Sequence, residues 1–382
     1  MTARWPFETG DEWPAQDAAV APDQVDPSHY LLERYIERPR PAALSLYYRV
    51  KPAIPRPVQL AVRRAYARVQ ARRPFPRWPV EPLLVEAQRE EIRRRLSGRD
   101  GTLPFVNFWP DRARFGFMFT HDVEGPSGVQ AIPRLLEIEQ RHGIVSSWNF
   151  VAEEYNVDPI LFAELRSVGC EVALHGIKHD GRLFENRERF EAALPKIRHY
   201  MEQWGAVGFR SPATLRRAEW MHELATVGCM YDSSFWDTNP FEPQPGGCCS
   251  IFPYRIGDLV ELPITLLQDH TMLEILRDED IARWRDKTRW IMHEHGLVNL
   301  LVHPDYMDSE RRLRLYSEFL DFLRSQPNGW HALAADVASW WKLREEVSPA
   351  EAGSNPRRVG SSDVLPTLAH AVVRDGVVTY EH

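Results

Sequence analysis

The stretch Phe115-Gly116-Phe117-Met118-Phe119-Thr120-His121-Asp122-Val123-Glu124 decides the fold, because an apolar, aromatic run passes directly into a histidine and two acids. Short runs of this composition are typical of buried β-strands. Polar side chains at the end of such a strand are held rigidly at one edge of a sheet, where α/β proteins keep catalytic groups. The stretch therefore predicts a central strand that delivers Asp122 and Glu124 to a site.

Three further apolar runs end in polar residues in the same way. The run 169–174 ends at His175, the shorter run 207–209 ends at Arg210, and the run 297–302 ends at His303. Helix-like segments lie between the runs, and this alternation along the chain predicts parallel strands with helical crossovers. A barrel and a doubly wound sheet both fit the alternation, and in both the polar residues converge at one edge.

The rest of the chain flanks this region. Residues 1–112 are rich in proline and arginine and predict an arm or cap, with one helix over residues 82–96 preceded by extended chain. Residues 113–346 form the expected α/β unit that carries the polar strand ends. Residues 347–382 begin as a linker and end in a predicted hairpin that turns at Asp375-Gly376.

Charge limits the function classes. Lys and Arg number 47 against 54 Asp and Glu, and the formal net charge of −7 argues against general nucleic-acid binding. Residues 49–99 depart from this average with 14 basic residues and 4 acidic ones. They predict a solvated helical face or, as the alternative, a contact with an anionic membrane or a polyanionic substrate.

Hydropathy indicates where the protein works. No apolar run reaches the roughly 18 residues that a membrane span requires. Residues 1–17 are acidic and polar, without the apolar core of a signal peptide. We therefore expect a cytoplasmic protein with no transmembrane segment. The sequence carries no signal for an oligomeric state.

A pair of histidines indicates a metal site. His175 and His179 are four residues apart, so one helical turn would place both imidazoles within reach of one ion. This spacing also fits two packed or surface histidines. Asp122 and Glu124 favour the metal, because one acid can join the histidines while the other stays unligated, although both acids could instead cap a helix. Two histidines and one carboxylate leave open positions for water, as a hydrolytic zinc site needs.

The ordered set of motifs resembles the polysaccharide deacetylase family, also called the NodB-homology or carbohydrate esterase four family. The motifs are the strand end with Asp122, the pair His175 and His179, the triplet Arg210-Ser211-Pro212, an Asp-containing segment, and the late His303. The similarity covers residues 113–345. It implies a distorted (β/α) barrel of about seven parallel strands, here with an N-terminal arm and a C-terminal hairpin extension. It also implies a divalent ion, usually zinc, held by one acid and two histidines.

The resemblance assigns catalytic roles to four residues. Asp122 matches the general base, Arg210 the arginine that pairs with this base, and His303 the general acid. Because Arg210 is always charged and planar, we expect it to hold a carboxylate by a two-point contact, with a structural ion pair as the alternative. Ala213 stands where many members have tyrosine, at the position whose backbone N–H binds the oxyanion.

The resemblance also assigns the metal ligands. His175 and His179 match the two histidine ligands. The family commonly has adjacent aspartates in its first motif, whereas this chain has Asp122-Val123-Glu124. Some branches use an acid-x-acid form, and on that pattern Glu124 is the third ligand.

Several other polar and aromatic residues are candidates for the same site. Asp232 and Asp269 could orient His303 or bind substrate hydroxyls, or could simply form turns. Four aromatic residues follow expected strand ends, where a ring could stack on a sugar or pack in the core. They are Trp148, Phe235, Trp236 and Tyr306.

Together these features predict a zinc-dependent hydrolase that removes an acyl group, most simply acetyl, from the nitrogen of an N-acylated sugar or glycoconjugate. The expected partner is a carbohydrate or small amide substrate and not a nucleic acid. Two alternatives stay open, namely an amidase acting on a small cyclic amide and a catalytically silent carbohydrate-binding relative. Pocket shape, not the ligand set, separates the first from a deacetylase.

Overall fold

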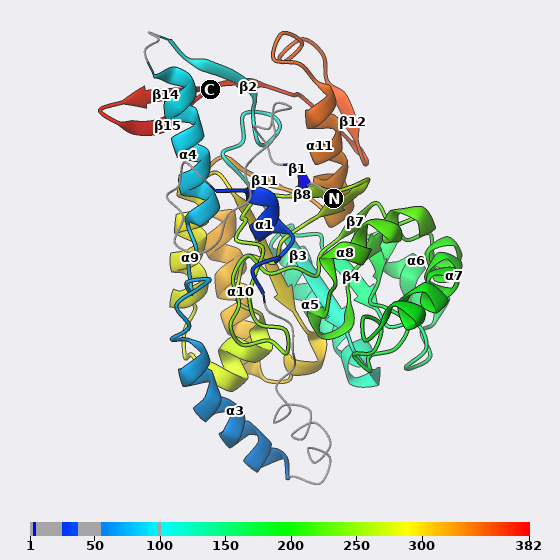
Figure 1. Cartoon of the computed structure of the whole chain (residues 1–382). Coiled ribbons are helices and arrows are strands. Elements are labelled where there is room, and N and C mark those ends of the chain that lie inside the picture. The colour runs from blue at the N-terminus through cyan, green and yellow to red at the C-terminus, as the bar shows by residue number, and fades with distance from the viewer. Residues whose placement is uncertain (1–2, 5–24, 37–54, 98–100) are drawn as a thin grey trace.

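The computed structural model of the 382-residue chain describes residues 3–4, 25–36, 55–97 and 101–382. Figure 1 shows a curled sheet surrounded by helices, with α3 (Arg56–Gln70) and the β-hairpin near the C-terminus at opposite ends of the molecule. No described helix combines the length and the apolar character that crossing a bilayer demands. The cytoplasmic location stays a prediction.

Seven parallel strands form the body of the sheet, in the order β10, β3, β4, β5, β6, β7 and β9. In that order their bounds are Leu297–Val302, Phe115–Val123, Ser147–Phe150, Glu171–Leu174, Gly208–Phe209, Tyr231–Asp232 and Leu259–Glu261. The short strand β11 (Gly329–His331) pairs in parallel with the start of β3. Beyond β9, β8 (Tyr254–Ile256) pairs antiparallel with β9, and β1 (Ala3–Arg4) pairs antiparallel with β8. The predicted α/β barrel with parallel strands is therefore confirmed.

The strand β3 lies inside the sheet along its whole length. It pairs with β10 from Leu297–Gly116 to Val302–His121 and with β4 over its second half. All nine of its residues are buried, as its apolar sequence predicts. The end of this strand is consequently fixed from both sides.

The two ends of the curled sheet approach each other through Asn299 of β10. Its backbone N–H donates to Thr265 Oγ1 at 2.8 Å, and its side-chain amide donates to the Pro263 carbonyl at 3.0 Å. Thr265 and Pro263 follow β9, the last parallel strand on the other side. Side-chain hydrogen bonds thus replace part of a regular ladder here, and the barrel is distorted.

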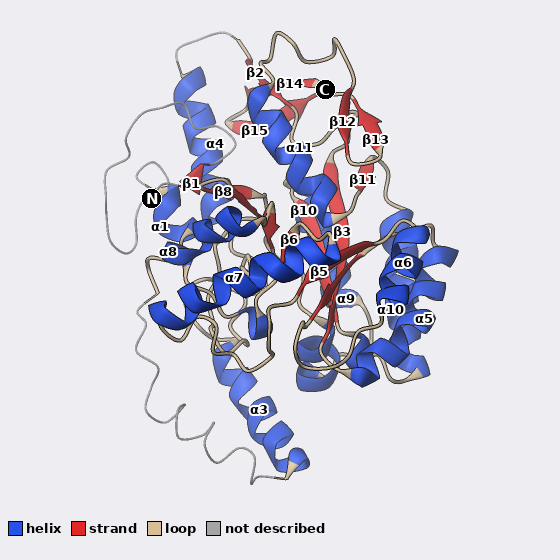
Figure 2. Ribbon diagram, turned by 90° about the vertical axis from the view of Figure 1, so that its right-hand side faces the viewer, coloured by secondary structure: helices blue, strands red, loops and turns tan. Residues whose placement is uncertain are grey.

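Helices connect the parallel strands and cover the sheet (Figure 2). Local signals set where they begin and end: Asp158 caps α6 (Pro159–Ser167) by accepting from Ile160 N–H at 2.9 Å, and Asn186 caps α7 (Arg187–Trp204). The other main helices around the sheet are α5 (Pro126–Arg141), α9 (Ala282–His293), α10 (Glu310–Arg324) and α11 (Ala334–Glu346). Between β6 and β7 the connection is the short α8 (Ala218–Met221) followed by the 3-10 helix His222–Val227.

The N-terminal region contains more helix than the sequence predicted. The helix over residues 82–96 is present as α4 (Leu83–Leu96), and a short α1 (Pro27–Leu31) precedes it. Extended chain was expected in the proline-rich part, but residues 56–70 form the fifteen-residue helix α3. Its prolines lie at or before the first turn, where a helix tolerates them, and the residues that follow contain no proline or glycine. The expectation was wrong because the prolines mark a helix start.

Polar contacts attach this region to the barrel. The buried Arg216 guanidinium pairs with the buried Glu33 carboxylate, and the Tyr254 hydroxyl donates to the Leu31 carbonyl at 2.9 Å. Farther along, Arg64 of α3 pairs with Glu274 at 2.7 Å. The N-terminal region therefore packs against the barrel as part of one structure.

The C-terminal hairpin is present as predicted. β14 (Leu368–Arg374) and β15 (Val377–Glu381) are antiparallel, and Asp375 and Gly376 form the turn with φ of 51° and 77°. β14 also pairs with β2 (Leu103–Val106), which precedes the barrel. A second small hairpin, β12 (Arg357–Val359) and β13 (Ser362–Val364), lies before it.

The close approach of β6 and β7 gives a stability prediction. A methyl group added at Gly208 would lie 2.0 Å from the Tyr231 ring, which is fully buried and tied by its hydroxyl to Glu171 at 3.0 Å. We expect Gly208→Ala to lower the free energy of unfolding by about 1–3 kcal/mol, measured by chemical denaturation. Gly101→Ala, which meets no atom within 4 Å, is the control. Equal stability of both variants would contradict the packing of these strands.

Candidate functional site

A cavity of about 220 Å³ opens where the carboxyl ends of the parallel strands meet. Asp122 and Glu124 lie at the end of β3, His175 follows β5, and His303 follows β10. The cavity lining includes Asp122, Glu124, His179 and His303, together with residues from other loops. The polar strand ends of the sequence thus converge in space.

The two-residue period of a strand divides the residues at the end of β3 between two sides. Thr120 and Asp122 both face Arg210, which binds them at 2.9 and 3.3 Å, and Glu124 continues on that side into the cavity. His121 faces the opposite side, where its Nε2 lies 2.6 Å from the buried carboxylate of Glu139. His121 is therefore held among the helices and does not face the cavity.

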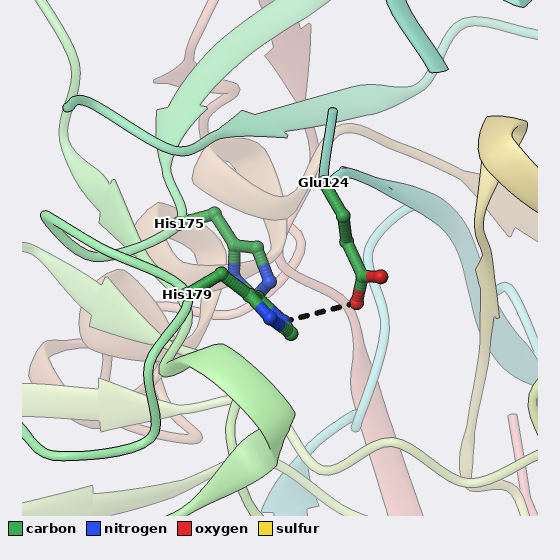
Figure 3. A group of neighbouring side chains, drawn as sticks. All are labelled: Glu124, His175 and His179. Atoms are coloured by element: carbon green, nitrogen blue, oxygen red, sulfur yellow. Dashed lines mark ion pairs between the residues drawn. The ribbon is translucent and has the colours of Figure 1, made fainter. Parts of the chain in front are cut away.

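Glu124, His175 and His179 form a three-residue cluster with the geometry of a metal site. One donor atom from each lies within 4.8 Å of the others. His179 Nε2 and Glu124 Oε1 are 3.0 Å apart. Figure 3 shows the carboxylate and the two imidazoles pointing toward one another. Two imidazoles and one carboxylate are a donor set that divalent cations such as zinc accept.

The protonation of His175 fits a cation. Its Nδ1 lies 3.1 Å from the Arg210 carbonyl, which can only accept, so Nδ1 carries the proton and Nε2 the lone pair. Burial, partly opposed by Asp122, lowers the pKa of His175 to about 4, which keeps the ring neutral. Its Nε2 is buried and has no hydrogen-bond partner among the described residues. An orphaned lone pair that faces a carboxylate and a second imidazole suits a metal ligand.

Asp305 holds the backbone of Glu124 in place. The Glu124 N–H donates to Asp305 Oδ2 at 3.0 Å, and Asp305 also accepts from Ser127 Oγ and Gly128 N–H at the start of α5. Burial alone would raise the pKa of Glu124, but the histidines His179 and His303 hold it well below its ordinary value. The carboxyl group is therefore ionised, as a ligand must be. Asp305 had no assigned role in the sequence.

Asp122 lies beside the cluster and outside it. Its Oδ1 accepts from Asn149 Nδ2 at 2.7 Å and from Arg210 Nη1 at 3.3 Å, while Oδ2 lies 3.7 Å from His175 Nε2. Burial would raise the pKa of Asp122, but the charges of Arg210, His175 and His303 lower it below its ordinary value. Asp122 Oδ1 thus accepts two hydrogen bonds, and Oδ2 points toward the cluster of Glu124, His175 and His179.

Arg210 makes a different contact from the one expected. It touches Asp122 through Nη1 alone, and not by two parallel hydrogen bonds. Its Nε and Nη2 donate to the Ser233 carbonyl and hydroxyl at 2.6 and 2.7 Å, and Nη1 also donates to Thr120 Oγ1. The expected two-point contact with a carboxylate is therefore corrected. Ser233 and Thr120, on neighbouring strand ends, accept the other hydrogen bonds of the guanidinium.

His303 is oriented by Asp269. Its Nδ1 lies 2.8 Å from Asp269 Oδ1, and its backbone N–H donates to Oδ2 at 3.1 Å. Burial would lower the pKa of His303, but the carboxylates of Asp269, Glu124 and Asp122 raise it to about 10. Its Nε2 lies 4.0 Å from Asp122 Oδ2 and 3.7 Å from Glu124 Oε1. A protonated imidazole therefore stands across the site from Asp122.

Comparison with solved structures identifies proteins that share this fold. No protein-family model matches the sequence, and no curated protein shows significant sequence similarity. Among solved structures, a protein assigned as a polysaccharide deacetylase from Mycobacterium smegmatis superposes with a TM-score of 0.53 at 21% identity, covering 65% of this chain and 97% of that one. A second such protein, from Pseudomonas aeruginosa, gives 0.52 at 16% identity, over 66% and 98% of the two chains.

This chain has the polysaccharide deacetylase fold. The same fold occurs with a different activity, because PuuE allantoinase also superposes with a TM-score of 0.52 at 14% identity, over 66% of this chain and 97% of that one. At these identities the similarity concerns the architecture alone.

Some of the expected supporting residues lie at the cavity of this deacetylase fold. Tyr306 and Ala213 line it, and Ala213 adopts φ 54°, a left-handed conformation that is uncommon for a residue with a side chain. Trp236 is buried behind the wall and donates from Nε1 to the lining residue Thr214 at 3.0 Å. Of the two candidate acids, Asp269 is the one that contacts His303.

Two candidates lie elsewhere. Trp148 is fully buried in the core and stacks on the His121 ring at 4.0 Å between centroids, so it cannot reach a sugar. Asp232 is buried next to Glu261 and accepts from Ser234 Oγ at 2.8 Å, away from the cavity lining. The predicted substrate contact is corrected for both residues: Trp148 packs beside His121 on the helix-covered side of the sheet, and Asp232 is bound by its own turn, the alternatives that the sequence left open.

Several residues that line the cavity had no predicted role. Arg63 comes from α3, and Glu242, Gln268 and His270 come from loops around the barrel mouth. Gln268 and His270 flank Asp269, so their position next to a candidate residue was a usable signal. Arg63 carried none, because its place at the cavity depends on how α3 packs.

The cluster predicts selective loss of metal binding in one of two matched variants. Glu124→Gln keeps the size of the side chain but removes the charge of a ligand, so we expect divalent-cation affinity to fall about tenfold or more. Glu242→Gln makes the same change on the same cavity outside the cluster and should leave affinity unchanged. Zinc titration by calorimetry measures both. Equal affinities would remove Glu124 from the ligand set.

Proposed function

We propose that the chain is a metal-dependent hydrolase that removes an acyl group, most simply acetyl, from the nitrogen of an N-acylated sugar or glycoconjugate. One observation carries the proposal: the two acids at the end of β3 occupy different positions. Glu124 lies with His175 and His179 in a metal-like cluster, while Asp122 stands outside it, ionised and beside it. Zinc is the proposed cation, since it favours this ligand set.

Asp122 is the proposed general base. Asn149 and Arg210 hold its Oδ1, so Oδ2 is the atom placed to take a proton from the attacking water. A divalent cation at the cluster would polarise the acyl carbonyl and lower the pKa of a bound water. Arg210 keeps Asp122 charged and fixes its orientation. The base is therefore ready before substrate binds.

His303 is the proposed general acid. The Asp269 carboxylate beside it raises the pKa of the imidazole, and the protonated ring can give its Nε2 proton to the departing amine nitrogen. Asp269 holds the other ring nitrogen and so points Nε2 toward Asp122 and Glu124. The backbone N–H of Ala213, on the cavity lining, is the proposed oxyanion donor.

The cavity walls support a carbohydrate substrate. Tyr306 offers an aromatic ring, and Gln268, Glu242 and Thr214 offer hydrogen-bonding groups for hydroxyls. Because PuuE allantoinase shares the fold to the same degree, a small cyclic amide is the second candidate substrate. A carbohydrate-binding relative without activity is the third possibility, and the retained Asp122 and His303 argue against it.

Metal analysis followed by a substrate panel tests the proposal. The purified protein is stripped with a chelator, reloaded with zinc, and assayed for acetate release from acetamido sugars and for ring opening of a cyclic amide such as allantoin. Zinc-restored acetate release supports the deacetylase, and zinc-restored ring opening alone supports the cyclic amidase. Binding of sugars without hydrolysis of either class would overturn the enzymatic proposal.

Replacement of the base separates chemistry from metal binding. Asp122→Asn removes the proton acceptor but no member of the cluster, so we expect kcat to fall by at least about a hundredfold while zinc content stays unchanged. The comparison uses steady-state kinetics and metal analysis on the same preparation. Undiminished hydrolysis in this variant would remove Asp122 from the base role.

Replacement of Asp269 tests how His303 is positioned. Asp269→Asn keeps the size of the side chain but removes the charge that holds the imidazole, so we expect kcat to fall about ten- to a hundredfold with little change in KM. Zinc content should not change, because Asp269 lies outside the cluster. A large rise in KM with constant kcat would indicate that Asp269 binds substrate instead.

A further inference from the structure

Arg63 brings a cation to the cavity from outside the barrel. It belongs to α3, in the N-terminal region, and lines the same cavity as Asp122, Glu124 and His303. Its side chain is partly buried, and its Nη2 donates to the Phe241 carbonyl. None of the motifs at the strand ends includes this residue.

The guanidinium of Arg63 has no counter-charge among the residues that the structure describes. The neighbouring arginines differ in this respect: Arg64, the next residue, pairs with Glu274 at 2.7 Å, and Arg312 pairs with the same carboxylate at 2.6 Å. An arginine has five N–H donors, and a carbonyl uses only part of them. The remaining donors of Arg63 are available on the cavity side of α3.

Glu242 is the nearest candidate in sequence for neutralising Arg63, because it follows Phe241 and lines the same cavity. Its Oε1 instead accepts from Gln268 Nε2 at 2.5 Å and from Thr271 Oγ1 at 3.3 Å. It forms no ion pair with Arg63 within the described part of the chain. A partly buried cation without a carboxylate partner favours an anion brought by a ligand.

We propose that Arg63 determines specificity by binding an oxyanion, a carboxylate or a phosphate, on the substrate. The inference rests on the proposed function, since it places the acyl nitrogen at the metal cluster and the anionic group at α3. The planar guanidinium suits either anion by a two-point contact, which a neutral sugar hydroxyl cannot match. The preferred substrate is thus an N-acylated sugar that carries a negative charge.

Three substrates and three variants test this inference. N-acetylglucosamine is the neutral substrate, N-acetylmuramic acid carries a carboxylate, and N-acetylglucosamine 1-phosphate carries a phosphate. The variants are Arg63→Gln, Arg63→Lys, and the control Arg68→Gln, which removes the same charge from an exposed position of α3. Steady-state kinetics on zinc-loaded protein gives KM and kcat for each combination.

We expect the wild-type protein to prefer one anionic substrate, and Arg63→Gln to raise KM for it about ten- to a hundredfold with kcat nearly unchanged. KM for N-acetylglucosamine should not change, Arg63→Lys should retain part of the effect, and Arg68→Gln should behave as wild type. The substrate that responds identifies the anion as carboxylate or phosphate. Equal effects on neutral and anionic substrates, or none on either, would overturn the inference.

Direct binding separates this inference from the proposed reaction. Calorimetric titration of N-acetylglucosamine 1-phosphate and N-acetylmuramic acid into zinc-loaded Asp122→Asn measures affinity without turnover. If no substrate is hydrolysed by the wild type, the proposed function fails, and loss of anion binding on adding Arg63→Gln still supports the site. If neither anion binds more tightly than N-acetylglucosamine, the anion site fails, whatever the activity.

Discussion

The two-residue period of β3 is the constraint on which the site depends. Asp122 and Glu124 share one side of the strand, whereas His121 is turned to the other side and bound by Glu139. Because β3 is paired on both sides, it cannot shift by one position without turning the acids toward the helices and His121 toward the cavity. The register of one strand thereby sets which side chain meets the histidines and which stays apart.

The parts predicted from sequence are those fixed by local chain direction. An apolar run followed by a polar residue predicted where each strand ends. Because the strands are parallel, their ends lie at one edge of the sheet, where the structure places Glu124, His175, His179 and His303 together. Contacts between distant segments left no such signal. The position of Arg63 depends on how α3 packs against the barrel. The main partner of Arg210 is Ser233, which lies on a neighbouring strand end that no local pattern identifies. The sequence left the role of Trp148 open, because alternation along a four-residue strand does not tell which side faces the cavity.

The fold of this protein does not by itself determine its reaction. Proteins assigned as polysaccharide deacetylases and an allantoinase share its fold to the same degree, so the fold alone does not identify a substrate. In the proposed function, the cavity walls outside the strands select the substrate. Here they come from α3 and from the loops that carry Glu242 and Gln268, the segments where the sequence was least informative.

The pairing of β2 with β14 has a consequence for synthesis of the protein. Val106 of β2 lies opposite Leu368 of β14, and β3 lies against β10. β2 and β3 are therefore synthesised long before the strands with which they pair. Such long-range pairing slows folding and leaves apolar edges open in the nascent chain. A growing chain that already holds both histidines still lacks β10, and chaperones that shield the open β10 edge of β3 should raise the yield of folded protein.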